Sequence, residues 1–168
     1  MTERFARIFR ERRNLYLLAF WMLILGADQA TKALVRTRMS VGESIPEDSP
    51  VRLTYVQNTG SAFGLFANQT LALTIAAAVG VVVIAIIFFR GGGASNLLAV
   101  SLIMQLAGAI GNLIDRIAYG YVVDFVDFRV WPVFNVADSS ITIGFITLAV
   151  ALLFGKDSRD KASDGTPP

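Results

Sequence analysis

Two aspartates lie close to the start of the last apolar segment of the chain. Asp124 follows two valines in the sequence Tyr121-Val-Val-Asp-Phe125, and Asp138 follows Phe134-Asn-Val-Ala. A carboxylate at the edge of a lipid bilayer costs free energy, so it is rarely there for packing alone. Two carboxyl groups that converge on one point cannot easily both ionise, and such a pair can supply one acid and one base. The pair is therefore a candidate for acid–base chemistry, provided that the fold brings the two side chains together.

The residue types that are absent narrow the chemistry further. The chain has no cysteine and no histidine. This excludes disulfides, thiol nucleophiles, Ser-His-Asp and Cys-His catalysis, and the commonest zinc ligand. Catalysis would have to use Asp, Glu, Lys, Arg, Tyr, Ser, Thr or the backbone, and paired carboxylates are the best candidates for hydrolysis.

Composition indicates that the elements positioning these aspartates lie in lipid. Of 168 residues, 54% are hydrophobic, and only 17% are charged, against about 25% in soluble domains. The net charge of +2 comes from basic residues outside the apolar segments, mainly at the two ends of the chain. Basic residues beside membrane spans usually report orientation, so we expect no nucleic-acid partner. The first apolar run lacks a small-x-small cleavage site, and we interpret it as a retained anchor.

Four segments are long and apolar enough to cross a bilayer, which needs about 20 residues in a helix. They are residues 14–35, 70–89, 96–117 and 137–154. We therefore predict a mainly α membrane protein: a basic N-terminus at 1–13, a single four-helix domain at 14–155, and a disordered tail at 156–168.

The positive-inside rule predicts that both termini are cytoplasmic. The loops 36–69 and 118–135 then lie on the outer face. Residues 51–56 alternate and are rich in β-branched and aromatic side chains, which predicts a strand in a small outer β-region. The unusual polar residues all gather at this same face: they are Asp28, Lys32, Asn112, Asp115, Arg116, Asp124 and Asp138.

Five short blocks resemble the motifs of the lipoprotein signal peptidases, also called signal peptidase II. They occur in the family's order among four spans, and the resemblance covers residues 15–154. The blocks are Asp28-Gln-Ala-Thr-Lys32, Gln57-Asn-Thr-Gly-Ser-Ala-Phe-Gly64, Gly108-Ala-Ile-Gly-Asn-Leu-Ile-Asp-Arg116, Val122-Val-Asp-Phe125 and Phe134-Asn-Val-Ala-Asp-Ser-Ser-Ile-Thr142.

The resemblance implies an aspartic endopeptidase of the bacterial cytoplasmic (inner) membrane, with its active site at the outer, periplasmic face. Its partners would be membrane lipids and prolipoproteins that carry diacylglycerol on the lipobox cysteine, and the cut would fall just before that cysteine. Asp124 and Asp138 would form the catalytic dyad, with no cofactor and no metal. Globomycin-type cyclic peptides would inhibit the enzyme.

The resemblance also assigns roles around the dyad, each beside a simpler reading. Asn112 and Arg116 would contact substrate, although an interfacial arginine can instead reach toward lipid headgroups. Asn58 and Gly60 would line the site, or form an ordinary turn. Asn135 would hold a dyad carboxylate and contact substrate. Asp28 and Lys32 are spaced i, i+4 on one helix face, so we predict that they pair with each other and support the site from a neighbouring helix. Asp115 would pair with Arg116 or order the loop, and would also support the site structurally. Asp138 alone could simply cap the last helix.

Two other function classes remain open from the residues alone. A small proton- or ion-coupled transporter would also carry Asp, Asn and Lys inside the membrane. Such a path would need polar residues at several depths, whereas residues 70–89 carry no charge at all. A purely structural membrane subunit would leave the clustered polar residues without an explanation.

Overall fold

The computed structural model describes residues 2–60, 70–91 and 95–154. The elements in chain order are α1 (Thr2–Arg38), β1 (Ser44–Ile45), β2 (Arg52–Asn58), α2 (Thr70–Gly91), α3 (Asn96–Tyr119), β3 (Val122–Asp127) and α4 (Val136–Phe154). The tail at 156–168 and residues 61–64 of the outer-loop motif lie outside the described residues.

The four predicted spans are confirmed as helices that are long and apolar enough to cross a membrane. Within the described residues these stretches are Glu11–Arg38, Thr70–Arg90, Asn96–Tyr119 and Val136–Leu153. The first helix is longer than the predicted span, because α1 continues without a break through the basic N-terminal segment. The α3 helix has clear ends: Ser95 caps its first turn, and Gly120 ends it in the left-handed conformation.

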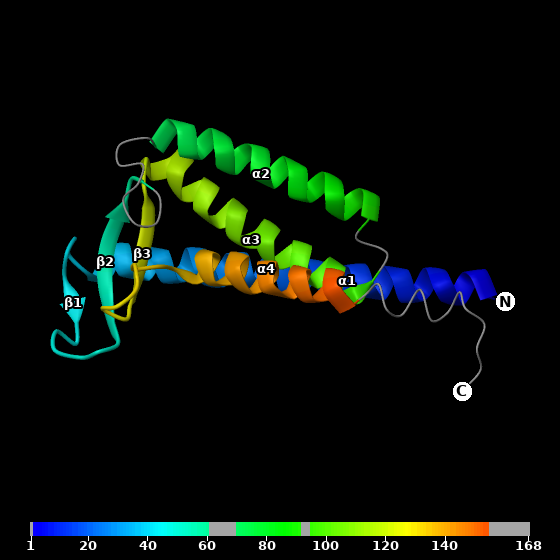
Figure 1. The fold of residues 1–168 in the computed structure, drawn as a ribbon, viewed down its shortest axis with the longest axis horizontal. Helices are drawn as coiled ribbons and strands as arrows, with labels where there is room; N and C mark the ends of the chain where they lie inside the picture. Colours follow the sequence, from blue (N-terminus) through cyan, green and yellow to red (C-terminus); the bar gives the residue numbers. More distant parts are fainter. Residues whose placement is uncertain (1, 61–69, 92–94, 155–168) are drawn as a thin grey trace.

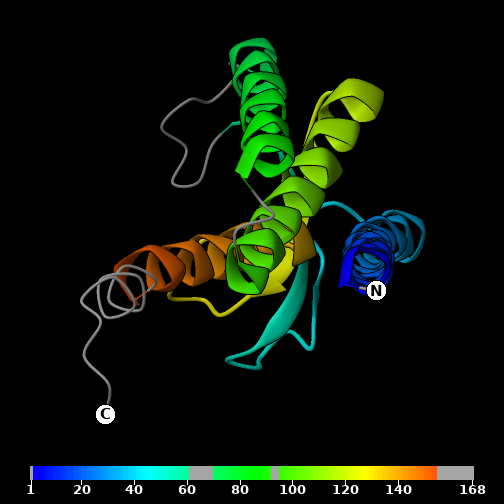
Figure 2. The ribbon, with the colours of Figure 1, turned by 90° about the vertical axis from the view of Figure 1, so that its right-hand side faces the viewer.

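The α3 helix lies at the centre of the bundle, with α2 on one side and α1 and α4 on the others (Figures 1 and 2). Small residues permit this packing. Ala107 and Gly108 are buried, and a Cβ atom added to Gly108 would overlap the backbone carbonyl of Ala137 in α4. A Cβ added to Gly111 would lie 2.5 Å from an oxygen of the Asp28 carboxylate. Close helix approach therefore depends on these glycines.

Replacing Gly108 with alanine is expected to destabilise the fold by about 1–3 kcal/mol, because the new methyl group meets rigid backbone. The measurement is the midpoint of thermal unfolding of the purified protein in detergent. Gly80→Ala in α2 is the matched control, since an added Cβ there has no atom within 4 Å. Equal midpoints for the two variants would contradict the packing argument.

A three-stranded antiparallel sheet lies at one end of the bundle, in the order β1-β2-β3 (Figure 1). This confirms the small β-region, and β2 covers most of the predicted strand 51–56. The prediction of a loop over 118–135 was wrong for residues 122–127, which form β3. Five of the six β3 residues are buried, so the strand lacks the alternation of an exposed one. Its hydrogen-bonding partner β2 lies far away in the sequence.

Apolar contacts fix this sheet against α1, and one ion pair joins two of its strands. Val35 of α1 packs with Tyr55, Val123 and Phe125 in a buried cluster. On the sheet itself, Asp127 accepts hydrogen bonds from Arg52 Nε at 2.7 Å and from the Thr54 hydroxyl at 2.8 Å. The strand β3, which carries Asp124, is therefore fixed to α1 by apolar contacts and to β2 by side-chain hydrogen bonds.

Candidate active site

The two aspartates come from different elements, Asp124 from the middle of β3 and Asp138 from the first turn of α4. The chain between them turns back on itself. Phe134 forms an antiparallel bridge with Val126, in which each backbone N–H donates to the other residue's carbonyl. This bridge brings Asn135 beside Asp124 and starts α4 directly afterwards.

Asn135 connects the two carboxyl groups. Its Nδ2 donates to Asp124 Oδ1 at 2.6 Å, and its Oδ1 accepts from the backbone N–H of Asp138 at 2.8 Å. The Asn135 backbone N–H in turn donates to Asp138 Oδ2 at 3.3 Å. The last two bonds form a reciprocal capping box. The sequence suggested Asp138 as the cap of this helix, but Asn135 occupies the cap position and Asp138 lies three residues inside.

Two further asparagines hold the remaining carboxylate oxygens. Asn58 of β2 donates to Asp124 Oδ2 at 2.8 Å, and Asn112 of α3 donates to Asp138 Oδ1 at 2.7 Å. Strand register explains the first contact: Asn58 is opposite Val122, and Asp124 is two residues further along the same face. Asn58 Oδ1 also accepts from the backbone N–H of Gly60 at 3.0 Å, which orders the turn after β2.

Lys32 donates a hydrogen bond to Asn112 and belongs to a buried network of charged side chains. The Lys32 ammonium donates to Asn112 Oδ1 at 2.9 Å and lies 2.9 Å from Asp28 Oδ2 and 3.2 Å from Asp115 Oδ2. All three charged side chains have 0% exposure. The predicted pairing of Asp28 with Lys32 at i, i+4 is therefore present, with Asp115 as a second partner.

The two acids of this network also bind backbone. Asp28 Oδ1 accepts from the N–H of Ala137 at 2.9 Å, in the first turn of α4. Asp115 Oδ2 accepts from the N–H of Val123 at 3.1 Å, one residue before Asp124. The network therefore fixes the position of both elements that carry the dyad. The sequence left open a pairing of Asp115 with Arg116, but the cations beside Asp115 are Lys32 and Arg36.

A cavity of about 580 Å³ opens beside the two aspartates. Its polar residues include Arg116, which is half-buried and lies on α3 one turn after Asn112. Most of the rest of the wall is apolar and comes from the segment before α4 and from α4 itself. The lining residues that the sequence predicted for the site are Asn58, Gly60, Asn112, Arg116, Asp124 and Asp138. The other four predicted residues do not line the cavity but contact residues that do, or backbone beside them. They are Asn135, Asp28, Lys32 and Asp115.

The environment of Asp124 favours its neutral form. Burial, and the negative charge of nearby Asp138, raise the pKa of the Asp124 carboxyl to about 7. Hydrogen bonds from Asn58 and Asn135 and the charge of Lys32 oppose this shift without cancelling it. Asp124 therefore holds a proton about half of the time near neutral pH, as an acid–base group requires.

Sequence reasoning missed several residues around the site. Arg36 lies 3.4 Å from Asp115 Oδ1 and stacks 4.2 Å from the centre of the Tyr119 ring. Its position one turn after Lys32 was the available signal. Trp131 and Pro132 line the cavity. Ser139 and Thr142 line it as well, and their closeness to Asp138 on α4 was the signal there.

The chain is similar in sequence to known proteins over most of its length. Residues 20–154 match the sequence profile of the family described as "Signal peptidase (SPase) II". The chain is 45% identical over 143 residues to a lipoprotein signal peptidase of Moorella thermoacetica, covering 83% of this chain and 95% of that protein. It is 40% identical over 148 residues to one of Pelotomaculum thermopropionicum, covering 88% and 97%.

Solved structures are also similar. A bacterial membrane enzyme structure determined by the in meso method at 2.3 Å resolution superposes with a TM-score of 0.77 and 31% sequence identity, covering 87% of this chain and 91% of that one. A second, at 1.9 Å resolution, gives a TM-score of 0.73 at 31% identity, covering 83% and 93%.

Proposed function

Because the chain belongs to the lipoprotein signal peptidase family, whose members are proteases that process prolipoproteins, we propose that Asp124 and Asp138 form its catalytic dyad. The observation that carries this proposal is the pair of carboxyl groups joined through Asn135 at the wall of one cavity. The polar residues gather at one end of the bundle, which favours hydrolysis at a single site over a transport path through the membrane.

In this mechanism the dyad carries one proton, shared between two carboxyl groups. The ionised carboxyl takes a proton from a water molecule, and the water oxygen attacks the carbonyl carbon of the peptide bond. The protonated carboxyl donates its proton to the carbonyl oxygen, giving a neutral tetrahedral diol. Cleavage of the C–N bond then transfers a proton to the departing amine. One water is consumed, and the dyad returns to its starting state.

Neighbouring side chains would position the peptide bond of the substrate beside the two carboxyl groups of the dyad. Arg116 offers several donors beside the two aspartates, suited to a peptide carbonyl or a lipid ester of the substrate. Asn58, Gly60, Asn112 and Asn135 would contact the peptide or fix the carboxylates. The apolar wall of Trp131, Pro132 and their neighbours suits a substrate whose cysteine carries diacylglycerol and lies partly in the bilayer.

The chain is a multi-pass membrane protein, and we assign it to the bacterial cytoplasmic membrane. The basic residues at the end of the bundle opposite the sheet support a cytoplasmic location for that end. The sheet and the dyad would then lie at the outer face, where the signal peptide of an exported prolipoprotein meets the membrane surface.

The direct test is incubation of the purified protein with a diacylglyceryl-modified prolipoprotein, read by gel shift and mass spectrometry of the new N-terminus. We expect one cut, immediately before the modified cysteine, and inhibition by a globomycin-type cyclic peptide. The same prolipoprotein without its diacylglycerol is the control substrate. Equal cleavage of both substrates, or a cut elsewhere, would contradict the proposed specificity.

The pKa of Asp124 predicts the alkaline side of the pH profile. Because this pKa is raised to about 7, the dyad loses its shared proton as the pH rises through that value. The rate should fall above about pH 7, approaching about tenfold per pH unit well beyond it. A rate profile under subsaturating substrate measures this limb. A rate that stays constant up to about pH 9 would be inconsistent with Asp124 as the proton donor.

Removing the hydrogen bond from Asn58 to Asp124 should shift the alkaline limb of the rate profile to higher pH. The bond from Asn58 Nδ2 stabilises the ionised form of Asp124, so Asn58→Ala should raise the pKa of Asp124 further. The alkaline limb is then expected to shift upward by roughly one pH unit. Gln57→Ala is the matched control, because the Gln57 amide donates to the Tyr55 hydroxyl and does not contact Asp124. An unchanged limb in Asn58→Ala would refute the assignment.

A further inference from the structure

A second groove, of about 700 Å³, lies far from the dyad near the other end of the helices. It runs between α1 and α2, and α3 forms its floor. We name it the basal groove, and its main lining residues are Arg13, Leu17, Trp21, Phe88, Arg90 and Ile103. Nothing in the proposed peptidase mechanism uses these residues.

The interior of the basal groove suits a hydrocarbon chain. Leu17 and Ile103 are buried in one apolar cluster, and Trp21 and Phe88 pack against it partly buried. The outer rim remains open to the bilayer, since Leu18 and Phe89 also line the groove and are exposed by 53% and 84%. An acyl chain could therefore enter from the side without crossing a polar barrier.

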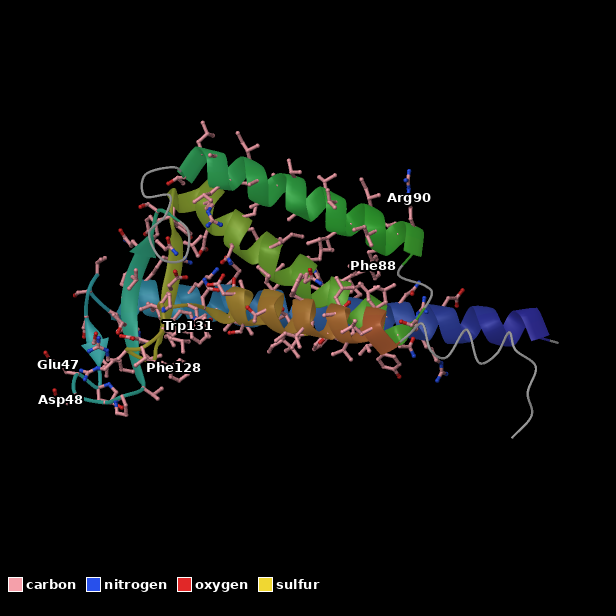
Figure 3. All side chains as sticks on the ribbon, in the orientation of Figure 1. Glu47, Asp48, Phe88, Arg90, Phe128 and Trp131 are labelled. Carbon is pink, nitrogen blue, oxygen red and sulfur yellow. The ribbon has the colours of Figure 1, made fainter. Side chains whose placement is uncertain are left out.

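Two arginines from different helices lie at the mouth of the groove. Arg13 is half-buried on α1, and Arg90 lies in the last turn of α2. Figure 3 shows Phe88 directed toward α3, while the Arg90 side chain extends from α2 on the side away from α3. The Arg90 side chain is long and exposed, so it can turn toward a group bound at the mouth. A guanidinium binds phosphate through several donors, which makes this end suited to a phosphate group.

Trp21 adds a second and independent observation. Its indole N–H is buried, and no acceptor for it is present among the described residues. A buried donor without a partner costs free energy, so such a group usually has an acceptor in the working protein. Trp21 lies further along α1 than Arg13, away from the mouth of the groove. A phospholipid has the same order of groups, because its ester carbonyls lie between the phosphate and the acyl chains.

We propose that the basal groove binds an anionic phospholipid. Its phosphate lies at Arg13 and Arg90, an ester carbonyl accepts from the Trp21 N–H, and an acyl chain packs on Leu17, Phe88 and Ile103. Two cations at the mouth favour a lipid with net negative charge over a zwitterionic one, whose own ammonium would oppose them. This inference does not rest on the proposed peptidase function, because it concerns the opposite end of the molecule.

The test is native mass spectrometry of the purified full-length protein with equal amounts of phosphatidylglycerol and phosphatidylcholine. We expect preferential retention of phosphatidylglycerol, and a loss of about fivefold in Arg13→Gln and in Arg90→Gln. Arg12→Gln is the matched control: it removes the same charge from an exposed neighbour on α1 that does not line the groove. It should leave retention unchanged, and Trp21→Phe should lower retention of both lipids.

Three results would overturn the proposal. Equal retention of the two lipids would show that charge does not select the ligand. An equal loss in Arg12→Gln and Arg13→Gln would show a diffuse attraction to basic residues rather than a site. Displacement of the lipid by soluble glycerol phosphate at equal concentration would show that free phosphate is the ligand. Binding is read directly, so loss of peptidase activity cannot be mistaken for any of these results.

Discussion

Replacing Asp124 or Asp138 with asparagine is expected to lower the rate of signal-peptide cleavage by roughly 10³-fold or more. Asparagine keeps the shape of the side chain, and its single amide oxygen can still accept one of the two hydrogen bonds that each aspartate receives. It cannot accept the proton of the attacking water or give a proton to the carbonyl oxygen. Either substitution alone should cause a loss of this size, because in the proposed mechanism each carboxyl group performs a different proton transfer.

The measurement is the initial rate on the lipidated prolipoprotein, with helix content from circular dichroism and the unfolding midpoint as checks on the fold. Asp48→Asn is the matched control, since Asp48 is an exposed aspartate of the loop between β1 and β2. It should cleave at the normal rate. Substantial cleavage by a well-folded Asp124→Asn or Asp138→Asn protein would rule out the dyad mechanism.

Replacing Lys32 with methionine is expected to destabilise the fold by about 3–5 kcal/mol, which is the cost of breaking a buried ion pair on one side. Asp28 and Asp115 are fully buried, and both lie within 3.2 Å of the Lys32 ammonium. Asp28 would lose its nearest cation, and Asn112 would lose the donor that orients its amide toward Asp138. Activity should therefore fall together with stability.

A double-mutant cycle separates this pairing from a simple loss of packing. Asp28→Asn combined with Lys32→Met removes both charges of the i, i+4 pair, and should recover part of the lost unfolding midpoint. Arg38→Met is the matched control, since Arg38 is an exposed basic residue near the end of the same helix. Strictly additive losses for Asp28 and Lys32 would contradict a direct interaction between them.

The amino-acid sequence alone indicates that this protein lies in a lipid bilayer and that carboxyl groups are its candidates for catalysis. Long apolar segments can satisfy their backbone groups in lipid only as helices, so the four spans follow from hydropathy and length. The absence of histidine and cysteine left carboxylates as the candidates for hydrolysis. Local spacing also identified Asp28 and Lys32 as a pair, because residues four apart share a helix face.

How the two aspartates are held depends instead on contacts between distant parts of the chain. Asn58 and Asp124 are 66 residues apart, and Asp28 contacts the backbone of a residue 109 positions away. Such contacts depend on strand register and helix packing, which no local pattern encodes. The strand β3 was missed for the same reason, since its burial comes from β2 and the helices. The role of Asn135 as the link between the carboxyl groups likewise required the turn from β3 into α4.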